Sequence, residues 1–564
     1  MATSKNTPRV PHTVDGIQVN YCKNALCANF GIEAREKLPR TKKAGSSETY
    51  RIAGDDGQVR VLICLLCRRT SIIKSNLAIA QELLRFNLKN YRRIEAACSN
   101  EQCKFFGCSQ ARHPAQYYAH GTTKSGEPRF RCRSCGSTFS CGAQIRKQRR
   151  AELNAAILKL LVNKVPMRRM CEILAITPST LYSKINYLYE VTSEYSNQSE
   201  SKLQKEALAH SRAYISVDRQ DHTLNWGTQF DRRNTILGAL GAVENISGYV
   251  LAMQLNFDAD LNAEDVEADA IARGDYTLPP AFRHYARVWL RRDYEAKLDD
   301  ATVKDHQVDL LESVDPGIKA PQSGMQVHLE YLQSALFFHL KAMLKGVERL
   351  RFCLDRDPGM DTACMAAFAN EIKQRKVDVF LLKNLKDASM AKKKTIISSA
   401  NRELDKFRKK MGLTGNCRSE LVLERLKEFQ RTPDRDPWFQ YPLADMAEPN
   451  KAILYLTDFG DYDIDHLSRL YMRITMRGID RFFMQVRRRL SLMERPIASP
   501  SSKKMWHGYS AYSPLVATQV LTIFRVYYNY CMVGEDKKTP AMRFGLAKKP
   551  ISLDELATPI QSKV

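Results

Sequence analysis

The chain has 564 residues, which is too many for one hydrophobic core, so about two to four domains are expected. Lysine and arginine (87) outnumber aspartate and glutamate (62), and the net charge of +25 favours a polyanionic partner, most simply nucleic acid, over a merely basic protein. The sequence contains no apolar run of about 18 residues and no apolar secretion signal, which argues against a membrane protein and predicts a cytoplasmic location.

Cysteines gather in the N-terminal quarter of the chain, where nine of the fifteen occur between Cys22 and Cys135. In a chain without a secretion signal, this clustering favours metal binding over disulfides. Two C-x4-C pairs recur with an offset of 76 residues, and each is followed by a C-x2-C pair. The two sets are Cys22, Cys27, Cys64 and Cys67, and Cys98, Cys103, Cys132 and Cys135. Each set matches the ligands of a tetrahedral zinc ion, and the alternative is a set of reduced, buried cysteines.

These repeats predict two small β domains of the zinc-ribbon type, at residues 1–90 and 91–148. Such small units bury little surface, so the metal would supply much of their folding free energy. Cys108, His113 and Cys141 lie near the second set and are further possible ligands. The sequence leaves open whether the ribbons contact DNA or a partner protein.

Residues 149–200 are predicted to form an all-α helix-turn-helix domain. Apolar residues at helical spacing begin at Leu153, Pro166 can start a second helix, and Thr177 can cap a third with Pro178 at its first position. The third helix would enter the major groove of DNA, although three helices can also pack together without binding DNA. The side chains expected to face DNA are Ser179, Thr180, Ser183 and Lys184. The polar stretch from Val191 to Lys205 is predicted to be a linker.

Three β-like runs follow, separated by glycine-containing turns: Ala213–Val217, Thr235–Val243 and Gly248–Leu255. Next come a helix, a fourth run that ends at Asp355, a second helix and a fifth run, Val377–Leu382. The order βββ-α-β-α-β is typical of a ribonuclease H-like fold, a mixed sheet with helices on its faces. The sequence thus predicts a multidomain protein whose largest part is an α/β ribonuclease H-like catalytic core.

The predicted core is discontinuous. It comprises residues 208–256 and 327–500, and two charged segments, 257–326 and 386–451, are interpreted as helical insertions that contact either DNA or a second subunit. Residues 501–564 form a predicted C-terminal helical tail.

Three acidic residues are candidates for a metal site. Asp218 and Asp355 are expected to end the first and fourth strands, which lie side by side in a ribonuclease H-like sheet. Divalent cations relieve the repulsion between neighbouring carboxylates, and oxygen ligands suit Mg²⁺ or Mn²⁺. Asp480 opens a basic stretch of a helix predicted from about Leu467 to Met493, and Arg487 shares its face. Rival acids are Asp221, Asp357 and Asp361 for the first pair, and Asp463, Asp465 and Glu494 for the third position.

At this point the chain resembles bacterial insertion-sequence transposases of the DDE class, which belong to the retroviral integrase-like superfamily. The resemblance covers roughly residues 95 to 560. The motifs that carry it are Arg129-Phe-Arg-Cys-Arg-Ser-Cys-Gly-Ser-Thr-Phe139, Val217-Asp218, Leu354-Asp355, Ile479-Asp480-Arg-Phe-Phe483 and Thr539-Pro-Ala-Met-Arg-Phe-Gly-Leu546. Three features depart from the family: the third acid is aspartate where glutamate is usual, the acids are 137 and 125 residues apart, and the first zinc unit is additional.

The resemblance implies metal-dependent cleavage at transposon ends and strand transfer into target DNA. Asp218, Asp355 and Asp480 would then be the catalytic ligands of Mg²⁺ or Mn²⁺, and Arg487 and Arg488 would contact DNA. The expected partner is double-stranded DNA, both terminal inverted repeats and target, bound by a homodimer or higher oligomer in a bacterial, nucleoid-associated setting. Alternative readings are a metal-dependent nuclease or resolvase without joining activity, and a non-catalytic zinc and helix-turn-helix regulator.

Overall fold

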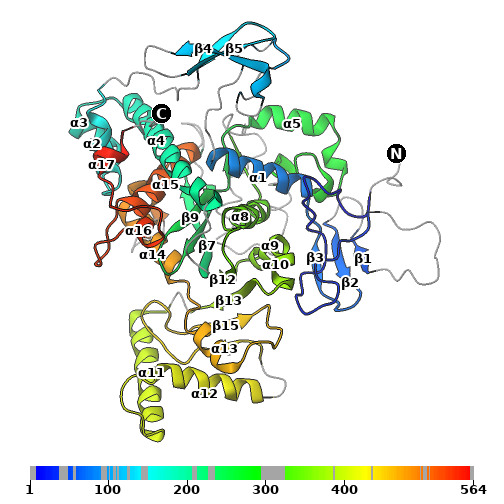
Figure 1. Ribbon diagram of the computed structural model, residues 1–564, viewed down its shortest axis with the longest axis vertical. Coiled ribbons are helices and arrows are strands. Elements are labelled where there is room, and N and C mark those ends of the chain that lie inside the picture. The colour runs from blue at the N-terminus through cyan, green and yellow to red at the C-terminus, as the bar shows by residue number, and fades with distance from the viewer. Residues whose placement is uncertain are drawn as a thin grey trace, which may run out of the picture.

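The computed structural model describes most of the chain as a multidomain, mixed α/β protein (Figure 1). The described residues are 8–36, 49–54, 59–90, 98, 100, 102–105, 110, 113–122, 128–140, 150–205, 212–226, 235–293, 324–384, 388–432, 436–495, 497–498, 505–506 and 509–558. Within them, no helix is long and apolar enough to cross a membrane.

A mixed sheet of seven strands, in the order β14-β15-β13-β12-β7-β8-β9, lies at the centre of the molecule. Its strands are β7 (Arg212–Leu224), β8 (Thr235–Glu244), β9 (Val250–Leu255), β12 (Arg349–Asp355), β13 (Val377–Lys383), β14 (Phe439–Gln440) and β15 (Ala452–Tyr455). Strands β7, β8 and β9 pair antiparallel, whereas β12 lies parallel to β7 and β13 lies parallel to β12. Strands β15 and β14 extend the sheet with antiparallel pairs. The predicted adjacency of the first and fourth core strands, β7 and β12, is confirmed.

Helices pack on both faces of this sheet, and two glycines of β8 allow their close approach. A Cβ atom on Gly238 would lie 2.8 Å from Cδ2 of Leu329, and one on Gly241 would lie 2.7 Å from Cδ1 of Ile479. Leu329 begins α8 (Leu329–Met343), whereas Ile479 belongs to α14 (Arg477–Arg489). Because successive side chains of a strand point to opposite faces, these two helices cover opposite faces of the sheet.

The other core helices fall beside these two. On the α8 side lie α9 (Met360–Ala367) and α10 (Ala369–Lys373), and on the α14 side lies α13 (Ile464–Tyr471). The single helix predicted from Leu467 to Met493 is therefore wrong, because α13 and α14 are separate helices. Glu448 explains the break, since it binds the chain between them: its Oε1 accepts hydrogen bonds from Thr475 Oγ1 (2.6 Å) and from the backbone N–H of Met476 (2.9 Å).

Strand β7 is much longer than the predicted run Ala213–Val217. It continues to Leu224 because Arg219 to Leu224 keep pairing with β8, from Leu240 to Thr235. Asp218 consequently lies within the strand and does not end it. The parallel neighbour β12 does end at Asp355, as predicted.

The two N-terminal units each contain a three-stranded antiparallel sheet. The first has β1 (Tyr50–Ala53), β2 (Val61–Cys64) and β3 (Thr70–Ile72), followed by α1 (Asn76–Asn90). The second has β4 (Tyr117–Thr122), β5 (Pro128–Cys132) and β6 (Thr138–Ser140), with a short 3₁₀ turn, η1 (Pro114–Gln116). Helix α1 packs along α8, whereas β4 and β5 stand well apart from the central sheet at the top of Figure 1.

Three helices follow: α2 (Leu153–Leu161), α3 (Met167–Leu174) and α4 (Pro178–Lys205). The predicted cap of the third is confirmed, because Thr177 Oγ1 accepts a hydrogen bond from the backbone N–H of Thr180 at 3.3 Å. The predicted linker from Val191 to Lys205 is wrong, since it forms the second half of α4. This half of the helix is held by the C-terminal helix α15 (Pro514–Tyr530), whose Arg525 pairs with the buried Glu200.

The remaining elements belong to the two insertions and the C-terminal region. The first insertion contains β10 (Phe257–Asp258), α5 (Ala263–Ala272), the 3₁₀ turns η2 (Asp275–Thr277) and η3 (Pro280–Phe282), and β11 (Met325–Gln326). The second contains α11 (Met390–Lys410) and α12 (Arg418–Arg431). The C-terminal region contains η4 (Ser491–Met493), β16 (Ile497–Ala498), β17 (Met505–Trp506), α16 (Pro540–Arg543) and α17 (Leu553–Leu556).

Candidate functional site

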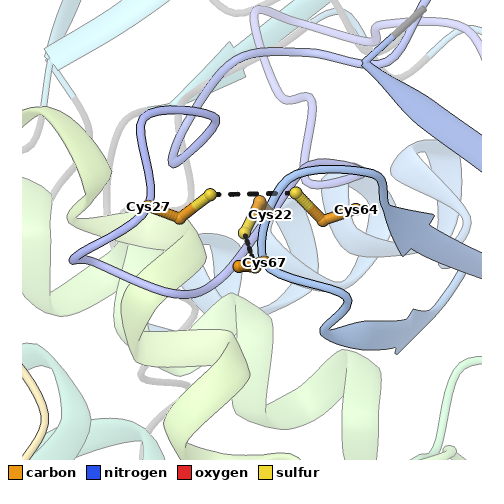
Figure 2. Close-up of side chains that lie close together, drawn as sticks. All are labelled: Cys22, Cys27, Cys64 and Cys67. Carbon is orange, nitrogen blue, oxygen red and sulfur yellow. Dashed lines mark hydrogen bonds between the residues drawn. The ribbon is translucent and has the colours of Figure 1, made fainter.

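The first cysteine set converges on one point (Figure 2). The Sγ atoms of Cys22 and Cys67 are 3.5 Å apart and those of Cys27 and Cys64 are 3.8 Å apart, and all four lie within 4.8 Å of one another. A tetrahedral zinc ion with bonds of about 2.3 Å requires sulfur–sulfur separations of about 3.8 Å. The four sulfurs therefore fit a zinc ion.

Hydrogen bonds around this set favour the thiolate form that zinc binds, whereas burial raises the pKa of Cys22 and of Cys27. Backbone N–H groups of Asn24 and Asn29 donate to Sγ of Cys22 (3.5 Å) and Cys27 (3.4 Å), and the Asn29 side-chain amide donates to Cys64 (3.3 Å). Burial raises the pKa of Cys64, but hydrogen bonds from the Cys67 backbone and from Asn29 outweigh it and lower that pKa to about 6.

The second set has the same geometry. The Sγ atoms of Cys98 and Cys135 are 3.4 Å apart, those of Cys103 and Cys132 are 3.8 Å apart, and all four again lie within 4.8 Å of one another. Both predicted four-cysteine sets are thus confirmed as possible zinc sites. Of the further donors, His113 caps η1 outside the set, and Cys108 and Cys141 lie outside the described residues.

The two sets differ in their surroundings. Cysteines of the first set belong to the main hydrophobic core, and Tyr21, next to Cys22, donates a hydrogen bond to the carbonyl of Ala366 in α9 at 2.5 Å. Cysteines of the second set belong to a small core of their own, with Tyr117, Phe105, Phe130 and Phe139 around them. The unit that contains the first cysteine set is consequently part of the main body, whereas the second unit has an independent core.

Asp218 and Asp355 lie on adjacent strands and on the same face of the sheet. Val217 and Leu354 are partners in the parallel pairing of β7 and β12, and each aspartate is the next residue of its strand. Register partners point to the same face, so both carboxylates point to the face that α14 covers, the face opposite to that of Val217 and Leu354. Asp218 is 5% exposed, and Asp355 is half-buried.

Asp480 is carried to this face by α14. The helix is anchored by Ile479, whose backbone N–H donates to Ser216 Oγ at 3.2 Å and whose side chain contacts Gly241, the β8 partner of Asp218. Asp480 itself is half-buried, in the first turn of the helix. One helix therefore brings the third acid to the region of the other two.

Arg487 lies close to the same acids. Burial lowers the pKa of its guanidinium and the charge of Arg495 adds to this effect, whereas the negative charges of Asp218 and Asp480 raise it. The predicted partner of Asp480 on its helical face is thus also within electrostatic reach of Asp218. Arg488, the other predicted DNA contact, is exposed.

Two residues of β7 that the sequence did not single out form a hydrogen-bonded chain that ends on Arg487. Oriented so that both ends of its amide are paired, Gln220 accepts a hydrogen bond from Arg487 Nη2 at 2.7 Å and donates one to His222 Nε2 at 3.2 Å. Burial, together with the positive charge of Arg487, lowers the pKa of His222 to about 3. Asp218, Gln220 and His222 alternate along one strand, and this spacing was the signal available in the sequence.

The rival acids lie elsewhere or have other partners. Asp221 and Asp357 share Arg219, at 3.1 and 3.3 Å, and Asp221 contacts Gly238 on the α8 face. Asp361 lies in the first turn of α9, Asp463 caps α13 through the backbone N–H of His466, Asp465 is exposed on α13, and Glu494 pairs with Lys164.

The three aspartates do not form a compact cluster of the cysteine kind. Among the described residues, only the two four-cysteine sets bring three or more possible ligand atoms within 4.8 Å of one another. A pair of divalent ions about 4 Å apart, with metal–oxygen bonds of about 2.1 Å, would bind carboxylate oxygens that lie up to about 8 Å from one another.

The residues of α4 that were predicted to face DNA differ in their exposure to solvent. Ser179 and Ser183 are exposed and Thr180 is half-buried, as a surface helix requires. Lys184 is only 3% exposed, and its Nζ donates to the carbonyl of Arg150 at 3.1 Å. This burial beside the chain that precedes α2 argues against its predicted contact with DNA.

Neither protein-family models nor curated proteins provide a match for this chain.

Proposed function

We propose that this protein is a DNA transposase of the DDE type, which cleaves DNA at transposon ends and transfers the cut strand into target DNA with Mg²⁺ or Mn²⁺. The observation that carries the proposal is the parallel pairing of β7 with β12. It sets Asp218 beside Asp355 on the face covered by α14, the helix of Asp480. In the sequence these acids are 137 and 125 residues apart.

The sheet supports a ribonuclease H-like core for this activity. The run β9-β8-β7-β12-β13 has an antiparallel half, a parallel half, and the first and fourth core strands at their junction. The acids lie at that junction, where β12 ends. Strands β15 and β14 and the two insertions are additions to such a core.

The chain's own residues would divide the work. Asp218, Asp355 and Asp480 would hold two divalent cations. When bound, these cations would activate water or a DNA 3′-hydroxyl as the nucleophile and would neutralise the charge on the leaving oxygen. Gln220 orients the Arg487 guanidinium beside the acids, where it can bind a phosphate oxygen. The exposed Ser179 and Ser183 of α4 would contact DNA, and the second zinc unit would add a further DNA-binding or partner-binding module.

The proposal is tested with the purified full-length protein and a supercoiled plasmid that carries the coding region with its natural flanking DNA. Wild-type protein should cut and rejoin this DNA with Mg²⁺ or Mn²⁺, whereas Asp218→Asn and Asp355→Asn should cut it at least about a hundredfold more slowly while still binding it. Asp221→Asn is the matched control, because this acid lies on the opposite face. Cleavage without joined products would favour the nuclease alternative, and DNA binding without any cleavage would favour a regulator.

A further inference from the structure

The second insertion contains a helical arm, formed by α11 and α12, and the outer helix, α11, is strongly basic. Helix α11 contains eight lysines and arginines and two acids, and at about 1.5 Å per residue its 21 residues span about 32 Å. Only Leu404 of this helix is buried, in a small core with Cys417 and Leu421 at the contact with α12. Figure 1 shows α11 and α12 at the edge of the molecule, beyond β15 and α13.

The two acids of α11 are both paired. Glu403 binds Arg425 of α12, whose Nε lies 3.0 Å from its Oε1, and Asp405 binds Arg408 at 2.7 Å. The negative charges of the helix are thereby neutralised by one arginine of α12 and one of α11 itself.

One face of α11 carries hydrogen-bond donors without any acid. Its members recur at alternating intervals of three and four residues, which places them in one row, and each is exposed. They are Lys392, Thr395, Ser399, Arg402, Lys406 and Lys409. Two of them also bond carbonyls of their own helix, Thr395 Oγ1 that of Ala391 at 3.1 Å and Arg402 Nε that of Ser398 at 3.4 Å. The row covers about 25 Å, and Lys394 and Lys410 add exposed positive charge beside it.

A solvated surface helix normally mixes both charges, as α12 does with Glu420, Glu424 and Glu428 among its four cations. An unbroken row of cations and hydroxyls matches instead a surface of regularly spaced phosphates. We infer that this donor row of α11 binds the phosphate backbone of duplex DNA. The identification of the polyanion as DNA rests on the proposed function. The inference gives the second insertion a DNA-binding role that is separate from the three aspartates.

The base of the arm is fixed to the helix that carries Asp480. Ser468 of α13 donates to the carbonyl of Ser419 in α12 at 3.4 Å, and Asp445, which follows α12, pairs with Arg477 at the start of α14. Glu448 binds the backbone N–H of Met476, and Lys451 binds Glu448 at 3.0 Å. DNA held by the arm would consequently have a fixed position relative to the acids.

The test measures binding of a labelled, mixed-sequence DNA duplex by the full-length protein over a range of salt concentrations. The variant Arg402→Glu/Lys406→Glu should bind at least about tenfold more weakly, and the slope of log affinity against log salt should become shallower by about two. The matched control is Lys345→Glu/Lys376→Glu, which changes the net charge equally. These exposed lysines precede β12 and β13, at the end of the sheet away from Asp355, so this control should stay close to wild type.

Equal affinity of the two double variants would overturn the inference, whether or not the protein cuts DNA. The milder variant Arg402→Ala/Lys406→Ala controls for misfolding of the charge-reversal variant. It should lose an intermediate amount of DNA affinity and keep the thermal unfolding temperature of the wild type. Wild-type protein that binds duplex through the arm but never cleaves it would reject the proposed function and leave the arm intact. Wild-type protein that fails to bind duplex at all would reject both.

Discussion

Gly241 of β8 and Ile479 of α14 are in contact at the point where the helix crosses the sheet. A Cβ atom on Gly241 would lie 2.7 Å from Ile479 Cδ1 and 3.0 Å from Phe483 Cε1. Gly241 is also the antiparallel partner of Asp218, and Asp480 follows Ile479. The depth at which α14 sits on the sheet, and hence the position of the third acid, depends on this absent side chain.

Gly241→Ala should therefore destabilise the protein by about 1–3 kcal/mol, because it overpacks a buried contact. Urea unfolding provides the measurement. Ile479→Val removes the atom that clashes most, so the double variant Gly241→Ala/Ile479→Val should recover part of the loss. A double variant less stable than both single variants would show that the contact is not the cause.

Buried His222 should make stability depend on pH. Burial and Arg487 lower its pKa to about 3 in the folded protein, below the value of about 6.5 expected when unfolded. Protonation then favours the unfolded chain, so the contribution is constant above pH 6.5 and falls as the pH drops toward 3. At pH 5.5 the loss should be about 1.4 kcal/mol.

The variant His222→Gln should lose this share of the pH dependence when urea unfolding at pH 7.5 and pH 5.5 is compared. His120→Gln is the control, because His120 is exposed on β4 and should leave the pH dependence unchanged. An identical pH dependence in wild type and His222→Gln would contradict the buried, neutral state of this ring.

The two cysteine sets should respond differently to loss of one ligand. Cys64→Ser and Cys132→Ser should each reduce bound zinc from about two ions per chain to about one, measured by elemental analysis. Cys64→Ser should also lower the main unfolding temperature, because the first set belongs to the main core, whereas Cys132→Ser should leave it nearly unchanged. Equal effects of both variants on the main transition would contradict the independent core of the second unit.

A buried ion pair fastens α4 to the C-terminal helix. Glu200 and Arg525 are each almost fully buried, and Tyr249 donates a hydrogen bond to Glu200 at 2.7 Å. Glu200→Gln would leave the Arg525 charge without its counterion and should cost about 3–5 kcal/mol in the free energy of unfolding. Glu190→Gln, an exposed acid on the same helix, should change it by less than about 0.5 kcal/mol.

The structural features that depend on residues close together in the sequence were largely predictable from it. The spacing of the cysteines predicted both four-cysteine sets, Thr177 and Pro178 marked the start of α4, and the apolar runs predicted β8, β13 and the end of β12 at Asp355. These features follow from ligand spacing, capping and burial within a few residues.

Features decided by distant residues escaped prediction. The second half of α4, predicted to be a linker, is helical, and its buried Glu200 pairs with Arg525, more than three hundred positions away. The length of β7 depends on pairing with β8, and the break before α14 depends on Glu448. The Gln220–Arg487 contact needed the packing of α14 on β7, which the sequence does not specify locally.

The central claim is tested most directly by measuring how many Mn²⁺ ions bind to the zinc-loaded protein, with calorimetry or electron paramagnetic resonance as the readout. If Asp218, Asp355 and Asp480 form one metal site, the wild type should bind about two Mn²⁺ ions, and Asp218→Asn and Asp355→Asn should each abolish tight binding, while Asp221→Asn should not. Mn²⁺ binding that is unchanged in both variants, or absent from the wild type in the presence of duplex DNA, would contradict the account.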